Sequence, residues 1–230
     1  PLFERNFPNV EFISRNENYD DVMCDFHVPS MTALGMMRAS EASFLTSSSS
    51  YLKPQQELAE QLRGKLRSFG AGRPVIGISW RSEAPVTGKI RSLELSRLLN
   101  SIPKEYIIVN LQYGNYGKEI SKVTGQLKRE VYSLEQIDNK NGIDGFCSLI
   151  SACDQVITID NSTVHFAGAL GVKCSLLLPH GSDFRWGGID EESTYWYQSV
   201  KILRQQSHGC WQQSLFQLSA QLAQLDYKTA

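Results

Sequence analysis

The sequence predicts an α/β fold in which a parallel β-sheet is covered by helices on both faces. Four short runs, at 73–80, 106–113, 155–159 and 173–179, are apolar almost throughout, which is typical of strands buried on both sides. Between them, apolar residues recur at intervals of three and four, the spacing of helices that bury one face. Strands that alternate with such helices form a parallel sheet.

The elements follow in a regular order from residue 54 onward. The first helix begins at Pro54 and ends before Gly70, and the second is stopped by Pro103, as these residue types favour. The other expected elements are a helix over 117–128, a short strand over 131–134, a helix over 143–153, a helix after 155–159, a strand over 200–205 and a final helix. About six strands in 73–226 predict a doubly wound, Rossmann-like domain.

Residues 1–45 offer fewer elements. Short strands are expected at 10–14 and within 24–30, and a small helix at 31–37. These pieces are too few to close a domain by themselves. The opening PLFERNFPNVEFISR has no initiator Met and no helix cap, so it reads as the interior of a longer protein.

The serine-rich stretch 41–54 divides the chain, because such low-complexity segments are typical of linkers. A serine-rich phosphate loop is the less favoured interpretation, since the stretch lacks glycine. The expected units are a remnant of an amino-terminal domain at 1–45, a linker and connecting helix at 46–72, and a Rossmann-like domain at 73–230.

Composition excludes several classes of protein. With 41% hydrophobic and 20% charged residues and a net charge of −1, nothing favours binding to nucleic acid or to an anionic membrane. No apolar run approaches the ~20 residues of a membrane span. The five cysteines form no CxxC pair and lie mostly in apolar surroundings, which favours buried thiols over disulfides and a cytoplasmic location.

Ligands of such sheets bind at the carboxyl ends of the strands, so the loops that follow strands hold the candidate residues. After 73–80, Ser79 ends the strand and Arg81, Lys89 and Arg91 follow in SWRSEAPVTGKIRS. Their cationic side chains are suited to clamping a phosphate. A solvated surface loop is the alternative.

The loop after 106–113 reads QYGNYG, and Gln112 and Tyr113 open it. Its aromatic rings are suited to stacking on a base or a sugar. The alternative is a plain turn in which the glycines adopt positive φ.

The loop after 155–159 is the richest in hydrogen-bonding groups. Asp160 stands at the strand tip, and the next three residues, Asn161, Ser162 and Thr163, are all good helix caps. His165 follows one turn into the helix. One cap suffices for one helix, so the surplus favours an anion held at the positive helix end. A packed or capping role for His165 stays equally open.

Several known motifs are absent. The sequence has no DxD pair for a metal beside a diphosphate, no G-x-S-x-G elbow and no G-x-G-x-x-G fingerprint. Its four histidines lie too far apart in sequence for a zinc motif. The segment HGSDFRWGG after 173–179 offers Asp183, Arg185 and Trp186 either as one wall of a pocket or as a structured loop.

Five segments, taken in order, resemble the carboxyl half of bacterial glycosyltransferases of family nine. They are VIGISWRSE, IIVNLQYG, SACDQVITIDNSTVHFAGALGVKCSLLLP, DFRWG and WYQSVKILRQQSHGCW. This family includes the lipopolysaccharide heptosyltransferases, and the resemblance is to members fused to tetratricopeptide repeats. ITIDNSTVHFAGALG is the most specific stretch.

The resemblance implies a glycosyltransferase-B architecture, in which the second of two Rossmann-like domains holds a nucleotide-diphospho-sugar without a metal or cofactor. Helix N–H groups and cations would stabilise the leaving diphosphate. Carried over to this sequence, the implied donor contacts are Asp160 at the ribose or diphosphate edge, Asn161, Ser162, Thr163 and His165 at the phosphates, Arg81 with Lys89 or Arg91 as counter-charges, Ser79 at the strand end, and Gln112 with Tyr113 at the base or sugar.

The catalytic group is not assigned by the resemblance. In the family, the acceptor site and often a catalytic carboxylate lie near the first strands of the amino-terminal domain, and the resemblance implies that this sequence starts after that region. His27 is the candidate base within 1–45. The acceptor is an unidentified glycan, lipid or protein.

Three functional hypotheses remain open. The first is an inverting transferase, or its donor-binding half. The second is a non-catalytic module derived from such a domain, and the third is a nucleotide-sugar epimerase of similar fold.

Overall fold

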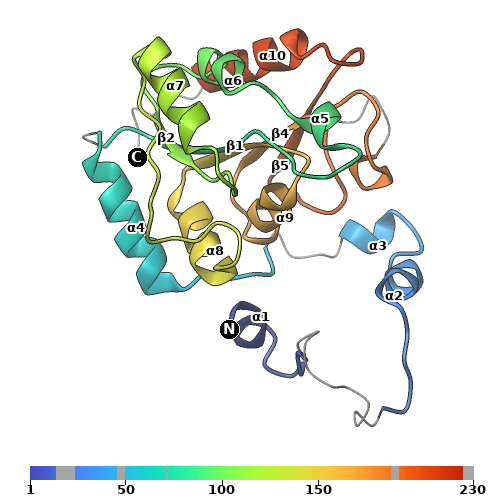
Figure 1. Cartoon of the computed structure of the whole chain (residues 1–230). Helices are drawn as coiled ribbons and strands as arrows, with labels where there is room; N and C mark the ends of the chain where they lie inside the picture. Colours follow the sequence, from blue (N-terminus) through green and yellow to red (C-terminus); the bar gives the residue numbers. More distant parts are fainter. Residues whose placement is uncertain (14–23, 46–49, 71, 188–191, 225–230) are drawn as a thin grey trace.

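The computed structural model describes residues 1–13, 24–45, 50–70, 72–187 and 192–224. A parallel sheet of five strands in the order β2-β1-β3-β4-β5 forms its centre (Figure 1). The strands are β1 (Val75–Ser79), β2 (Ile107–Asn110), β3 (Gln155–Ile159), β4 (Cys174–Leu178) and β5 (Val200–Arg204). The predicted α/β class and parallel sheet are confirmed.

The sixth expected strand is reduced to one bridge. Residues 131–134 approach the outer edge of β2, where Tyr132 pairs in parallel with Val109. The N–H of Asn110 donates to the Tyr132 carbonyl at 2.8 Å, and the Tyr132 N–H donates to the Ile108 carbonyl at 2.8 Å. The segment therefore continues the strand order without the length of a full strand.

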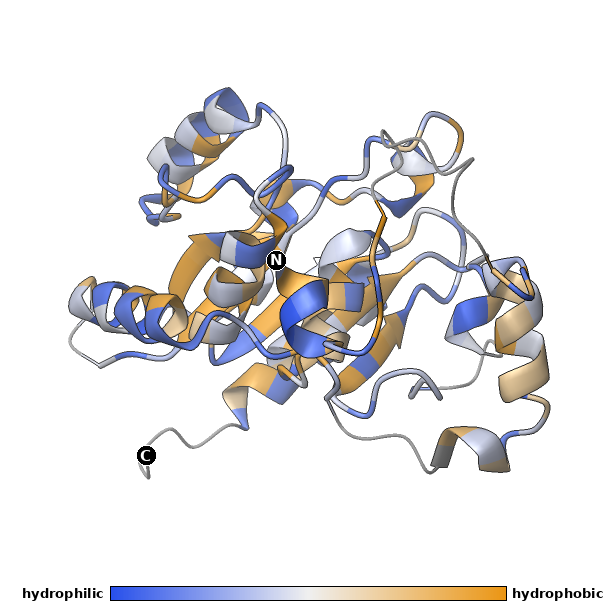
Figure 2. Ribbon diagram, turned by 90° about the horizontal axis from the view of Figure 1, so that it is seen from below, coloured by the Kyte–Doolittle hydropathy of each residue, from blue (hydrophilic) through white to orange (hydrophobic). Residues whose placement is uncertain are grey.

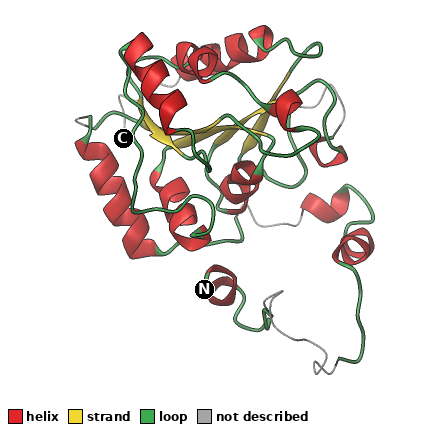
Figure 3. Cartoon of the chain, in the orientation of Figure 1, coloured by secondary structure: helices red, strands yellow, loops and turns green. Residues whose placement is uncertain are grey.

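Helices cover both faces of the sheet, as the doubly wound fold requires (Figures 1 and 3). One core lies between the sheet and the helices α4 (Gln56–Ser68), α8 (Ile143–Ala152) and α9 (Ser162–Ala169). The other core lies between the sheet and α6 (Leu95–Ser101), α7 (Gly117–Leu127) and α10 (Gln212–Ala223). The short helix α5 (Gly88–Arg91) lies in the connection from β1 to α6.

Alternation along each strand explains why the strands are apolar throughout. In β1, Val75 enters the α4–α8–α9 core, whereas Ile76 and Ile78 enter the opposite core. In β3, Val156 and Ile157 divide in the same way. Successive side chains of a strand point to opposite faces, and both faces here are covered. Figure 2 shows the strands as the most hydrophobic part of the ribbon.

The amino-terminal segment forms α1 (Leu2–Asn6), α2 (Ser30–Met37) and α3 (Ala42–Leu45). The helix expected at 31–37 is confirmed. The strands expected at 10–14 and within 24–30 are wrong where the structure describes them, because 10–13 and 24–29 are irregular and exposed. Neither stretch contributes a residue to the sheet.

Two anchors tie this segment to the sheet domain. Leu2 is buried with Leu52, Cys147 and Ala169, and Arg5 Nη1 donates to Asp144 Oδ2 at 2.9 Å. The Arg5 hydrogen bond lowers the pKa of the Asp144 carboxyl. The expected connecting helix, α4, adds Leu62 and Leu66 to the core of the sheet domain, so it belongs to one of the helix layers.

Three cysteines lie in the interior, in keeping with the prediction. Cys147, Cys153 and Cys174 are buried, Cys24 and Cys210 are exposed, and all five are free thiols. Burial raises the pKa of the Cys153 thiol to about 12. No helix within the described ranges is long and apolar enough to cross a membrane.

Two helical glycines give opposite expectations for stability. A Cβ at Gly168 would lie 2.3 Å from Cγ of Tyr197, whereas nothing lies within 4 Å of a Cβ at Gly64. We expect Gly168→Ala to lower the free energy of unfolding by about 1–3 kcal/mol. Gly64→Ala, in the exposed middle of α4, should raise it by about 0.5–1 kcal/mol. Urea unfolding of both variants measures the difference, and equal values would contradict the tight contact at Gly168.

Candidate functional site

The candidate site lies where the chain changes direction within the sheet. From β1 the chain winds outward to β2, then crosses back to β3 on the other side of β1. In sheets of this kind, ligands bind outside the carboxyl ends of the two strands at which the order reverses, which are β1 and β3 here. The donor contacts predicted from the sequence lie at the end of β1 or in the segments that follow β1, β2 and β3.

A buried polar network joins the ends of these three strands. Oε1 of Gln112 accepts hydrogen bonds from the hydroxyl of Ser79 at 3.1 Å, the N–H of Trp80 at 3.0 Å and the N–H of Arg81 at 2.8 Å. The Ser79 hydroxyl also accepts a hydrogen bond from Nδ2 of Asn161 at 2.8 Å. Ser79, Gln112 and Asn161 are all buried. The three predicted residues are brought together, and their polar groups hold the loops in place.

Asn161 is also the cap of α9. Its Oδ1 accepts hydrogen bonds from the N–H of Thr163 at 3.0 Å and from the hydroxyl of Thr158 at 3.1 Å. Thr163 is fully buried, whereas Ser162 is exposed at the first position of the helix. Of the three residues predicted to cradle phosphate, Ser162 alone faces outward. The cap uses one of the first-turn N–H groups that lack an intrahelical partner.

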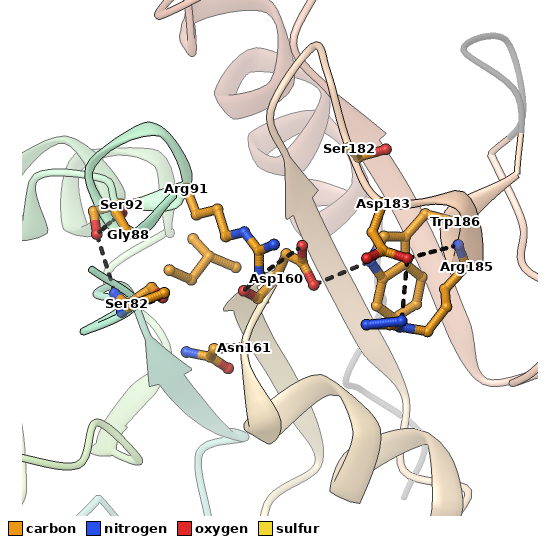
Figure 4. A network of polar contacts seen from close by, with 12 residues as sticks. Ser82, Gly88, Arg91, Ser92, Asp160, Asn161, Ser182, Asp183, Arg185 and Trp186 are labelled. Carbon is orange, nitrogen blue, oxygen red and sulfur yellow. Dashed lines mark hydrogen bonds and ion pairs between the residues drawn. The ribbon is translucent and has the colours of Figure 1, made fainter. Parts of the chain in front are cut away.

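Asp160 is the centre of a second network (Figure 4). Its Oδ1 accepts the indole N–H of the fully buried Trp186 at 3.0 Å. Nη1 of Arg91 lies 3.2 Å from Oδ2 of Asp160. The N–H of this nitrogen donates a hydrogen bond to the main-chain oxygen of Asp160 instead, at 3.4 Å. Among the described residues Oδ2 accepts no hydrogen bond, so we regard the contact as an ion pair. Arg91 thus balances a carboxylate whose side chain is 6% exposed.

His165 is fixed on two sides. Its Nδ1 lies 3.0 Å from the hydroxyl of Tyr197, and its ring stacks on Trp186 with centroids 5.3 Å apart. Burial lowers the pKa of the imidazole, and Arg185 lowers it further, whereas Asp160 and Asp183 act in the opposite direction. The balance favours a neutral ring at pH 7.

Arg81 and Lys89 border a separate hollow of about 520 Å³ on the outer side of the β1 loop. The guanidinium of Arg81 pairs with Glu119 of α7, with Nη2 and Oε1 2.9 Å apart. The same carboxylate accepts the indole N–H of Trp80 at 3.3 Å. Lys89 is exposed. The predicted counter-charges are therefore divided, with Arg91 at β3 and Arg81 held by α7.

Tyr113 lines a third feature, a polar pocket of about 240 Å³ beyond the end of β2. Asn139 and Leu134 line the same pocket. His27, the candidate base, is exposed in the irregular stretch before α2.

Three residues reach the site only through tertiary packing. The sequence leaves two roles open for Trp186, as one wall of a pocket or as part of a structured loop, and it predicts no role for Glu119 or Tyr197. Within the part of the chain that the structure describes, no three His, Cys, Asp or Glu side chains are grouped so that they could hold a metal ion.

The side chain of Asn161 caps α9 and also donates a hydrogen bond to Ser79 at the end of β1. Two variants distinguish the contributions of these two contacts to stability. Asn161→Ser retains a capping oxygen but is too short to reach Ser79, whereas Asn161→Ala loses both. We expect Ala to be less stable than Ser by about 0.5–2 kcal/mol, the usual contribution of a cap. Both should be less stable than the wild type, because the hydroxyl of Ser79 loses a partner. Chemical denaturation tests this order, and equal stability of the two variants would contradict the capping role.

The lowered pKa of His165 predicts a pH dependence of stability. The unfolded chain takes up a proton at its ordinary pKa of 6.5, whereas the folded protein takes it up only at lower pH. Between these values the unfolded state binds more protons, so stability falls as the pH drops from about 7. His165→Gln should flatten this part of the curve, as measured by unfolding between pH 7 and 5. The exposed His208, replaced in the same way, is the control.

Comparisons with known proteins place the fold. No protein-family profile matches the chain. The chain is 27% identical over 239 residues to Protein FlbA of Caulobacter vibrioides, a match that covers 96% of this chain and 39% of FlbA. The chain thus spans about two fifths of the length of this curated relative.

The chain also resembles solved structures. The ADP-heptose lipopolysaccharide heptosyltransferase II of E. coli matches 75% of this chain and 50% of its own, at 19% identity and a TM-score of 0.52. A glycosyl transferase family 9 protein from Veillonella parvula matches 70% of this chain and 44% of its own, at 14% identity and a TM-score of 0.49. The likeness to the E. coli enzyme shows that the chain shares the Rossmann-like α/β fold of one half of a heptosyltransferase.

Proposed function

We propose that this chain is the donor-binding half of an inverting, metal-independent glycosyltransferase that uses a nucleotide-diphospho-sugar. The observation that carries the proposal is that Ser162, exposed at the start of α9, comes two residues after Asp160, with which Arg91 forms an ion pair. Helix N–H groups and a guanidinium are the two groups best suited to a diphosphate. The heptosyltransferase-like fold supports the same class of reaction.

The donor site, defined here as Asp160, Ser162, His165 and Arg91, is arranged for a leaving group that gains negative charge. The N–H groups of the first α9 turn point out of the helix at Ser162 and carry the positive end of its dipole. Arg91 already balances the buried Asp160, so an added anion would not face an isolated carboxylate.

The polar pocket beside Tyr113 supports the nucleotide part of the proposal. It lies at the end of β2, two strands from β3 in the sheet. Neighbouring strands are about 4.8 Å apart, so the pocket is on the order of 10 Å from the α9 mouth. This distance suits a base at Tyr113 and a diphosphate at Ser162.

In the proposed reaction an acceptor oxygen attacks the anomeric carbon from the face opposite the diphosphate. The bond from that carbon to the phosphate oxygen breaks, and the diphosphate leaves with the electron pair. Fixed N–H groups and Arg91 stabilise this charge as it develops. The acceptor, a glycan, lipid or protein, gives its proton to a base, for which His27 remains the sequence-based candidate.

A non-catalytic nucleotide-sugar-binding module is the second candidate. It is favoured by one observation: Ser79, Gln112 and Asn161 spend their hydrogen bonds inside the protein. A site whose polar groups are taken up by internal bonds can bind a donor but has few groups left to assist the transfer of its sugar. Binding of a donor without release of its sugar, in the presence of extracts that contain acceptors, would favour this function.

The first test is a thermal-shift panel of ADP-, GDP-, UDP- and dTDP-linked sugars, with and without a chelator. A ligand at a hundred times its dissociation constant stabilises the folded state by about 2.7 kcal/mol. We expect one nucleotide to raise the melting temperature, with no loss when the chelator is added. No shift with any diphosphate would remove the proposal.

The second test is Ser162→Pro. Proline is well tolerated at the first helical position and removes that N–H, and Asn161 before it is extended, as a residue before proline requires. We expect donor binding to weaken about fivefold to tenfold with little loss of stability. Gln56→Pro at the equivalent position of α4, where Gln55 is also extended, is the matched control. Unchanged affinity would mean that the α9 end is only a structural cap.

A further inference from the structure

A further cavity, distinct from the hollow at Arg81 and from the polar pocket at β2, lies between the amino-terminal helices and the loops around β4 and β5. It has a volume of about 630 Å³ and is lined on one side by α2 and α3. On the other side are the 3₁₀ turn η1 (Phe184–Trp186) and residues 195–197. Figure 1 shows α2 and α3 standing outside the helix layer that contains α9. The volume falls within the range of small-molecule sites.

The walls of this cavity, which we call the aromatic pocket, are mainly aromatic. The rings that line it are Phe44, Tyr51, Phe184, Tyr195, Trp196 and Tyr197. Phe44 of α3 meets Trp196 edge-on, with ring centroids 4.9 Å apart, and lies 5.7 Å from Tyr195. These contacts join the two sides, so the wall is built by packing between segments about 150 residues apart in sequence.

Two guanidinium groups line the pocket, and one of them, that of Arg185, is paired with Asp183. That of Arg38 lies over the ring of Phe44, and that of Arg185 lies over the ring of Phe184, each 5.3 Å from the ring centroid. Arg38 donates to the main-chain oxygen of Ser43, and Arg185 pairs with Asp183 at 3.2 Å. Among the described residues that line the pocket none is acidic. The charge therefore favours an anion or a neutral ligand over a cation.

We propose that the aromatic pocket is a second ligand site, and that it takes an acceptor with a flat apolar group next to an anionic group. The apolar group would lie against Trp196 and Tyr195, and the anion would lie toward Arg38 and Arg185. The hydroxyls of a donor sugar would find few partners among these rings, and unpaired buried polar groups weaken binding. Its role as an acceptor site rests on the proposed transferase function.

His165 is the residue that the two sites share. It lies in the first turns of α9 and also lines the aromatic pocket. Its Nδ1 is occupied by Tyr197, which lines the same pocket. An acceptor in the pocket would therefore lie next to the donor diphosphate, as transfer requires.

The test uses the whole chain and two fluorescent probes of the same shape. 1-Anilinonaphthalene-8-sulfonate has the apolar body and an anion, and N-phenyl-1-naphthylamine has the body alone. We expect the sulfonate to bind at one site and more tightly than the neutral probe. Trp196→Ala should lower the affinity for both probes about tenfold, since aromatic side chains contribute most of the binding energy of such sites. Phe216→Ala, which removes an exposed ring on α10, should change neither.

A pair of charge variants at an exposed position tests the pocket without disturbing the fold. Met31 lines the pocket on α2 and is 59% exposed, so either charge is tolerated there. Met31→Glu should lower the affinity for the sulfonate about fivefold, and Met31→Lys should raise it. The affinity for the neutral probe should change little. Equal effects of the two variants on the sulfonate would overturn the proposal.

Competition separates this proposal from the donor site. A nucleotide diphosphate that binds the protein should leave the sulfonate bound, because the two sites differ. Displacement of the probe by the nucleotide would overturn the second site and assign the pocket to the donor. Probe binding that responds to Trp196→Ala while no nucleotide binds would keep the pocket and remove the transferase proposal.

Discussion

The side chain of Asn161 is the contact on which the rest of the site depends. It caps α9, donates to Ser79 at the end of β1, and is 8% exposed. β1 and β3 are neighbours in the sheet, and the bond from Asn161 to Ser79 ties the segments that follow them to each other. The proposed donor site lies at this point, so its geometry depends on that tie. Gln112 extends the same tie to β2.

Burial decides which polar residues build the site and which can serve a ligand. Internal hydrogen bonds occupy the side chains of Asn161, Ser79 and Gln112, because a buried polar group without a partner destabilises the fold. Ser162, Lys89 and Arg91 keep access to solvent in varying degree. Of the polar residues at the start of α9, the buried ones stabilise the fold and the exposed one is available to a ligand. Their exposure in the structure tells these two roles apart.

The aromatic pocket shows a different kind of organisation. Its rings come from α3, from η1 and from residues just before β5, and the α2–α3 segment has no strand to hold it. Aromatic contacts between Phe44 and Trp196 take the place of a sheet edge. Apolar packing therefore supplies here the join that hydrogen bonding supplies at the proposed donor site. The two proposed sites also differ in polarity, which suits two ligands of different chemistry.

By itself the sequence determined the fold class, the order of helices and strands in the sheet domain, and the loops that hold the candidate residues. These follow from local signals: strands buried on both faces are continuously apolar, and helices repeat every three to four residues. The tertiary structure decided the partners. Glu119 holds Arg81, Trp186 binds Asp160, and Tyr197 fixes His165. Each pair joins residues that are 26 to 38 positions apart, and no periodicity along the chain encodes such a contact.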